Sequence, residues 1–214
     1  MTEETTARDA ITRWAQSMFA RGLTGGSSGN ISVRLSNGSV LVTPTGTSMG
    51  FLDPARISLL DQNGMHVSGD PPTKEISLHD AFYQTRTQTG AVVHLHSCHS
   101  VALSVLPEND PDNVLPAITA YSVMKLGKVK LLPFFMPGDP AMGDAVRGLA
   151  GKRSAVLLAN HGPVVAGKDL DAAAFAMEEL EETAKLTLIC RGMSPRLLDN
   201  DQIQALVRQF DVDW

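Results

Sequence analysis

Two histidines separated by one residue, His94 and His96, follow a short apolar run, and their types and spacing suit metal chemistry. Because side chains two apart on a strand point to the same face, we expect the two imidazoles to lie side by side. A third histidine, His161, stands beside Gly162 and Pro163, in a sequence typical of a tight turn at a strand end. Three imidazoles with an open coordination position are typical of a catalytic metal site. The alternative is that each histidine is an ordinary core or surface residue.

Glu75 is the carboxylate candidate for the same site, and Lys74 precedes it. Both fall at the start of a predicted helix, where a carboxylate also complements the helix dipole. A lysine there opposes the dipole and favours a compensating anion, which is either Glu75 or a bound ligand. Of the remaining histidines, His79 and His99 are predicted to be non-ligands and His66 to be a turn residue.

Two polar loops, 25–32 and 43–48, are rich in glycine, serine and threonine. Both offer backbone N–H groups and hydroxyls, which are the donors that hold a phosphate. Neither loop matches the P-loop or the dinucleotide fingerprint, and each alone is typical of an ordinary turn. Together with Lys74, they predict a small anion pocket.

The elements that must position these residues alternate between strands and helices. Apolar periodicity predicts helices near 11–19, 73–85, 101–106, 139–149 and 169–191, and Thr73 is the expected cap of the second. Apolar runs predict strands near 31–35, 40–43, 57–61, 91–95, 129–135 and 154–158. This interleaving predicts a layered α/β/α domain, and we expect residues 1–214 to form a single domain.

Composition narrows the possible functions. The 214 residues are 43% hydrophobic and 19% charged, which is typical of a globular protein. A net charge of −5 without a block of lysine or arginine argues against nucleic acid as a partner. No apolar run reaches the roughly 18 residues of a membrane span, and the acidic start does not resemble a signal peptide. With only Cys98 and Cys190, we expect no disulfide framework and a cytoplasmic location.

Five motifs resemble the class II aldolase/adducin family, and they occur in the family's order over most of the chain. The motifs are Ser28-Gly29-Asn30-Ile31-Ser32, Thr43-Pro44-Thr45-Gly46, Thr73-Lys74-Glu75, His94-Leu95-His96-Ser97 and Asn160-His161-Gly162-Pro163. The resemblance implies an α/β fold, a three-layer α/β/α arrangement around a central, mostly antiparallel sheet. It also implies a homotetramer with active sites between subunits.

The resemblance further implies a role for each motif. Zn²⁺, with Mn²⁺ or Co²⁺ as alternatives, would be held by His94, His96 and His161. Glu75 would be a metal ligand in the resting state and an acid/base catalyst once substrate displaces it. Tyr121 resembles a tyrosine that the family contributes from the neighbouring subunit for proton transfer. The implied substrate-binding residues are Gly29, Asn30, Thr45, Gly46, Thr73 and Lys74.

Thr73-Lys74 departs from the family's sugar-phosphate aldolases, which carry a small hydroxyl pair before the acidic residue. The lysine suits a phosphorylated sugar acid, and this region resembles the branch of the family that decarboxylates 3-oxo-tetronate 4-phosphate. Loss of CO2 through a Zn-stabilised enediolate would give dihydroxyacetone phosphate. The alternatives are a Zn-dependent aldolase of fuculose or ribulose phosphates, a methylthioribulose-phosphate dehydratase, and a non-catalytic head like that of adducin.

Overall fold

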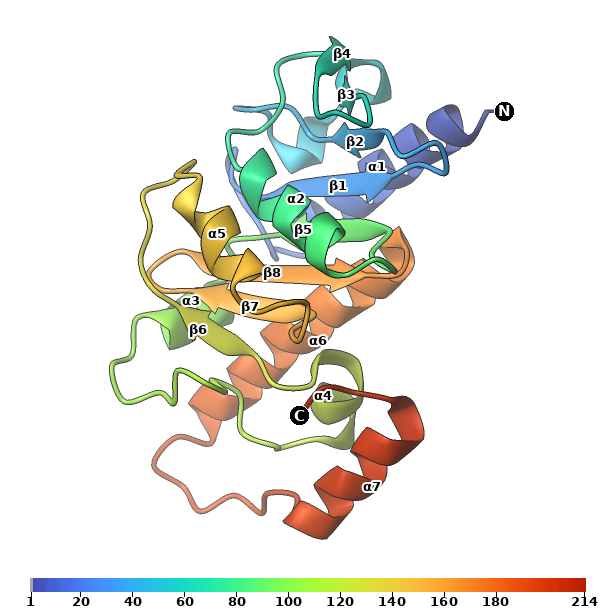
Figure 1. Cartoon of the computed structure of the whole chain (residues 1–214). Helices are drawn as coiled ribbons and strands as arrows, with labels where there is room; N and C mark the ends of the chain where they lie inside the picture. Colours follow the sequence, from blue (N-terminus) through green and yellow to red (C-terminus); the bar gives the residue numbers. More distant parts are fainter. Residues whose placement is uncertain (1) are drawn as a thin grey trace.

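The structure is a computed structural model that describes residues 2–214. Within these residues the strands form one sheet with helices on both faces (Figure 1). The strands are β1 (Asn30–Arg34), β2 (Val40–Val42), β3 (Ser58–Leu60), β4 (His66–Ser68), β5 (Ala91–His94), β6 (Lys130–Leu132), β7 (Ala155–Leu158) and β8 (Gly162–Gly167). Their order across the sheet is β4-β3-β2-β1-β5-β8-β7-β6. Every neighbouring pair is antiparallel except β6 and β7.

Helices cover both faces of the sheet. They are α1 (Glu3–Ala20), α2 (Ile76–Thr85), α3 (Cys98–Ser104), α4 (Ala120–Leu126), α5 (Ala141–Arg147), α6 (Leu170–Ile189) and α7 (Asn200–Phe210), with two 3-10 turns, η1 (Met49–Phe51) and η2 (Pro54–Arg56). In Figure 1, α2 and α5 lie in front of the sheet, and α1 and the long α6 lie behind it. No helix in the described part of the chain has the length and apolarity needed to cross a lipid bilayer.

Two apolar cores hold these layers together. Successive side chains of a strand point to opposite faces, and the central strands are apolar on both. Ala91 and Val93 of β5 pack in the core that includes α1 and α6, whereas Val92 packs in the core that includes α2 and α5. The strands β7 and β8 repeat this alternation. The centre of the sheet is thus buried on both sides, which makes its strand ends rigid supports for a site.

The predicted α/β/α fold with a mostly antiparallel sheet is confirmed, and so is the approximate place of each predicted helix and strand. Four further elements, β4, β8, α4 and α7, were not predicted. Glycines bracket β8 and a proline follows the first of them, so its sequence is typical of a turn. The prediction for His66 was wrong, because this residue belongs to β4, which pairs with β3.

The capping prediction for Thr73 was also wrong. Helix α2 begins at Ile76 and Glu75 is its N-cap residue, although the Glu75 side chain caps no backbone N–H. The Thr73 hydroxyl still accepts a hydrogen bond from the Glu75 N–H, at 3.3 Å. The helix starts late because Thr73 is held in an extended segment, where its own N–H donates to the Thr43 carbonyl.

The connection between β7 and β8 is a three-residue turn that ends at His161. Asn160 has a φ of 55°, a left-handed conformation that asparagine tolerates better than most residues. Gly162 then enters β8 against the backbone that follows β5. A Cβ at Gly162 would lie 2.3 Å from the Leu95 carbonyl oxygen and 3.3 Å from the His96 Cα. This glycine therefore sets the separation between His161 and His96.

We expect Gly162→Ala to lower the free energy of unfolding by about 2–3 kcal/mol, because the new methyl group overlaps backbone atoms that cannot rotate away. Urea unfolding of the metal-free protein measures this. Gly25→Ala is the matched control, because Gly25 has open space around its Cβ position and no positive φ. Equal stabilities of the two variants would contradict the close approach.

Candidate metal centre and substrate cavity

The sheet brings the candidate residues to one end of three adjacent strands. Asn30 opens β1 and pairs directly with His94, the last residue of β5. On its other side His94 pairs with Val164 of β8, and His161 precedes β8 by one residue. His96 stands two residues beyond His94, past the end of β5. Strand register therefore assembles these residues although they lie far apart in the sequence.

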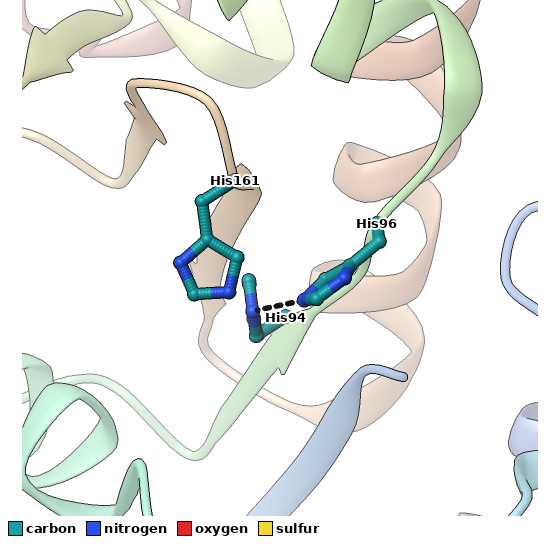
Figure 2. A group of neighbouring side chains, drawn as sticks. All are labelled: His94, His96 and His161. Carbon is teal, nitrogen blue, oxygen red and sulfur yellow. Dashed lines mark hydrogen bonds between the residues drawn. The ribbon is translucent and has the colours of Figure 1, made fainter. Parts of the chain in front are cut away.

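Figure 2 shows the imidazole rings of His94, His96 and His161 turned toward one another. One ring nitrogen from each lies within 4.8 Å of the others, and the Nε2 atoms of His94 and His96 are 3.2 Å apart. Two nitrogens that bind one tetrahedral zinc at 2.0–2.1 Å lie about 3.3 Å apart. The separation between His94 and His96 already matches that requirement.

The protonation of His94 is fixed by its backbone contact. Its Nδ1 lies 2.8 Å from the Pro163 carbonyl oxygen, which can only accept, so Nδ1 carries the proton and Nε2 carries the lone pair. A hydrogen bond of this kind orients a metal-ligating histidine. The side chain of His94 is fully buried, so its ring has little freedom to turn away.

Burial lowers the pKa of all three imidazoles. For His94, burial and then the neighbouring His96 and His161 hold the pKa well below its ordinary value, against the Pro163 hydrogen bond. For His96, burial and then His161 lower the pKa. For His161, burial lowers it, and the nearby Glu75 opposes the shift at both His96 and His161. Neutral imidazoles are the form that binds a metal.

Glu75 completes the set of donor atoms. Its Oε1 lies 3.4 Å from His161 Nε2, and its Oε2 lies 3.5 Å from His94 Nε2. A carboxylate oxygen facing the lone pair of His94 is unfavourable unless a cation lies between them. The donor set of three imidazoles and one carboxylate, with its second partners in place, therefore fits a divalent metal ion.

A cavity of about 240 Å³ opens beside these residues. Glu75, His96 and His161 line it, and so do all six predicted substrate-binding residues: Gly29, Asn30, Thr45, Gly46, Thr73 and Lys74. His94 lies beneath them and has no exposed surface. Both predicted polar loops therefore reach the same cavity as the histidine cluster.

The segment before α2 divides its side chains between the interior and the cavity mouth. Thr73 and Glu75 are each 8% exposed, whereas Lys74 between them is exposed. Gly138 passes close to this lysine, and a Cβ there would lie 3.1 Å from the Lys74 Cβ. The turn that leads into α2 thus buries the carboxylate beside the histidines and leaves the ammonium chain at the rim.

Tyr121 is the one predicted site residue that the described chain does not bring to this cavity. It lies on α4 with 61% of its surface exposed. Ser27, Ser28 and Pro44, which also line the cavity, belong to the two predicted loops. Sequence reasoning missed two residues of the lining, Pro137 and Gly138. Pro137 and Gly138 lie between β6 and α5, and their only signal was a Pro-Gly pair typical of a turn.

Comparison with known proteins agrees with this fold and site. The family model described as "Class II Aldolase and Adducin N-terminal domain" matches residues 9–188, so the chain belongs to the class II aldolase/adducin family. Among its relatives, a 3-oxo-tetronate 4-phosphate decarboxylase from Cupriavidus necator is 47% identical over the full length of both chains. An L-fuculose phosphate aldolase from Haemophilus influenzae is more distant, at 34% identity over 90% of this chain and 88% of its own.

Solved structures show the same similarity. The crystal structure of YgbL from Escherichia coli, described as an aldolase, epimerase or decarboxylase, superposes with a TM-score of 0.94. It is 45% identical to this chain and covers 96% of it, and the match spans 99% of YgbL.

We expect His96→Ala to lower the affinity for divalent metal by at least about 100-fold, because one of three imidazole donors is lost. His96 is the most exposed of the three, so the metal-free variant should keep its thermal stability. Titration of the metal-free protein with Zn²⁺ in a calorimeter measures the affinity. His66→Ala, which removes an exposed histidine from β4, is the control, and an equal loss in both variants would contradict the assignment.

Proposed function

We propose that the chain is a metal-dependent carboxy-lyase that converts 3-oxo-tetronate 4-phosphate into dihydroxyacetone phosphate and CO2. The observation that carries this proposal is the position of Lys74, which lines the same cavity as Glu75, His96 and His161. A cationic side chain at a metal site suits a substrate that has a carboxylate in addition to its phosphate. The names of relatives such as the C. necator decarboxylase support the same substrate class.

The two polar loops would bind the phosphate. Gly29 and Gly46 both have positive φ, at 82° and 70°. Gly29 cannot be replaced without strain, because a Cβ there would lie 2.9 Å from the His94 carbonyl oxygen. Turns that contain a residue with positive φ form the backbone concavities whose N–H groups bind anions. Thr45, on the second loop, adds a hydroxyl, and Asn30 follows Gly29 at the start of β1.

Lys74 would hold the substrate carboxylate at the cavity mouth. When the bond between that carboxylate and the neighbouring carbon breaks, CO2 leaves and its bonding electrons delocalise into the ketone. His94, His96, His161 and Glu75 would hold a divalent metal, for which we propose Zn²⁺ over Mn²⁺ or Co²⁺, and this ion would supply Lewis acidity for the resulting negative charge. Lys74 loses its anionic partner in that step. Binding the carboxylate too tightly would therefore slow turnover.

A proton must then reach the carbon that carried the carboxylate. Glu75 is positioned for this, because it lies in the cavity beside His161. We place Tyr121 in the same role from a neighbouring subunit of a homotetramer, and its exposure on α4 suits a residue that acts across an interface. A cytoplasmic location suits the two free cysteines, Cys98 and Cys190.

Two other functions remain as competing hypotheses. An aldolase acting on fuculose or ribulose phosphates would use the same metal and expel an aldehyde in place of CO2, but a neutral sugar gives Lys74 no partner. A non-catalytic head like that of adducin has no need of three histidines and a carboxylate around one cavity. The arrangement of Glu75 and the histidines therefore favours an enzyme, and Lys74 favours the decarboxylase.

Product analysis tests the main proposal. We expect the Zn²⁺-loaded protein to release CO2 and dihydroxyacetone phosphate from 3-oxo-tetronate 4-phosphates of both the erythronate and threonate series, at unequal rates. Removal of the metal with a chelator should abolish the activity. Faster cleavage of neutral sugar phosphates to aldehydes, measured as kcat/KM, would establish the aldolase instead.

Lys74→Ser tests the carboxylate role directly. Losing a charge-assisted contact worth about 1.5–3 kcal/mol should lower kcat/KM for the acid substrate by about 10- to 100-fold. Cleavage of a neutral sugar phosphate, where detectable, should change little. Lys152→Ser, an exposed lysine remote from the cavity lining, is the matched control. Equal effects of Lys74→Ser on acid and neutral substrates would refute the role.

A further inference from the structure

One buried titratable residue next to the metal site takes no part in the proposed reaction. His79 is fully buried on α2 and contacts Asn30 and Ser32 of β1. Glu75, His79 and Tyr83 are spaced four residues apart, so they share one side of α2 and its N-cap. Asn30 and Ser32 are two residues apart, so they share one face of β1. The two rows meet side chain to side chain, and Asn30 and Glu75 at one end line the cavity.

Hydrogen bonds join the two rows into a single chain. Tyr83 Oη lies 2.7 Å from Ser32 Oγ, and Ser32 Oγ lies 2.7 Å from His79 Nδ1. His79 Nε2 contacts Asn30 Oδ1, and Asn30 Nδ2 donates to Glu75 Oε2 at 2.8 Å. All five residues are less than 9% exposed.

The chemistry of each group fixes the direction of every bond. A carboxylate only accepts, so the NH₂ of Asn30 faces Glu75 and its amide oxygen faces His79. His79 must then carry its proton on Nε2, and its Nδ1 must accept from the Ser32 hydroxyl. Ser32 in turn accepts from Tyr83. All donors therefore point toward Glu75.

The electrostatics of the interior agree with these directions. Burial, and then the neighbouring His94, lower the pKa of His79 to about 3, although Glu75 opposes the shift. His79 is thus a neutral imidazole, with one donor and one acceptor nitrogen. Burial also raises the pKa of Tyr83, so its hydroxyl keeps the proton that it donates.

We propose that His79 is a positioning residue, which locks the Asn30 amide with its nitrogen toward Glu75 and so holds the Glu75 carboxylate against the metal site. This inference rests on the proposed function for the role of Glu75. Without the His79 donor, the buried Asn30 oxygen has no partner, and only Glu75 and Thr73 still orient the amide. The hydrogen bond from Asn30 to Glu75 is charge-assisted and about twice as strong as a neutral one, so its geometry is what His79 protects. The amide relays no proton, so the chain orients groups and does not conduct.

Three variants separate positioning from ordinary core packing. His79→Phe removes the donor and keeps a ring, and His79→Gln restores an amide N–H near the Nε2 position. Phe82→Leu, at a fully buried apolar residue of α2 that makes no side-chain hydrogen bond, is the control for lost stability. We expect His79→Phe to lower kcat by about 10- to 100-fold with a much smaller change in KM. His79→Gln should recover most of that loss, and Phe82→Leu should keep the wild-type kcat.

Two further measurements do not depend on substrate. In the Zn²⁺-loaded protein with ¹⁵N-labelled histidines, the His79 resonances, assigned by their loss in His79→Gln, should show the proton on Nε2. In the Co²⁺-loaded protein, His79→Phe should shift the visible absorption bands as Glu75→Gln does, and Phe82→Leu should not.

A proton on Nδ1 of His79 would overturn the proposal, whatever the variants do. So would a His79→Phe protein whose cobalt spectrum matches the wild type and whose activity follows its stability as in Phe82→Leu. If the protein releases no CO2, the proposed function fails, and the tautomer and the cobalt spectrum still decide the role of His79.

Discussion

The structure depends on one electrostatic constraint, the burial of three neutral imidazoles against one carboxylate. His94 Nε2 carries a lone pair because Nδ1 is bound to Pro163, and His96 and a Glu75 oxygen stand 3.2 and 3.5 Å away. The lone pair of His94 and the Glu75 carboxylate repel each other in this buried place, and a divalent cation between them would replace the repulsion with attraction. Since an ion that binds the folded chain stabilises it by mass action, the site links metal loading to stability.

Holding these groups together requires rigidity from the surrounding sheet. The strands that carry the site, β1, β5 and β8, are neighbours at its centre, and both faces of β5 are packed. Two glycines allow neighbouring backbone segments to pack closely, because neither has a side chain. Gly29 lies against the His94 carbonyl and Gly162 against the Leu95 carbonyl. Of the two polar loops that line the cavity, one leads into β1 and the other follows its neighbour β2. The sheet thus sets the geometry of the histidine cluster, and the proposed substrate contacts come from the segments that flank it.

Sequence reasoning identified residues whose local spacing already indicates a shared site. It missed residues that only the strand register and the packing of helices bring together. His94 and His96 are two apart on an apolar run, and Glu75 begins a helix. The role of His79 could not be predicted from the sequence. It arises only because every fourth residue of α2 faces every second residue of β1 in the folded protein. Strand β8 was missed because glycines bracket it, although its apolar residues fill both cores. The segment that carries Pro137 and Gly138 has no periodicity, so only the structure places it at the cavity.

The adjacent residues Lys74 and Glu75 explain how one metal site can serve different reactions. Expulsion of CO2 and expulsion of an aldehyde leave the same electron pair to be stabilised, so the histidines do not distinguish them. The distinction lies in how the leaving group is held before it departs. In the turn before α2, Glu75 is buried beside the histidines, whereas Lys74 is exposed at the cavity mouth, where a departing carboxylate would have room. Under the proposed role of Lys74, a change at position 74 would alter the leaving group that is recognised while the buried half of the site keeps its geometry.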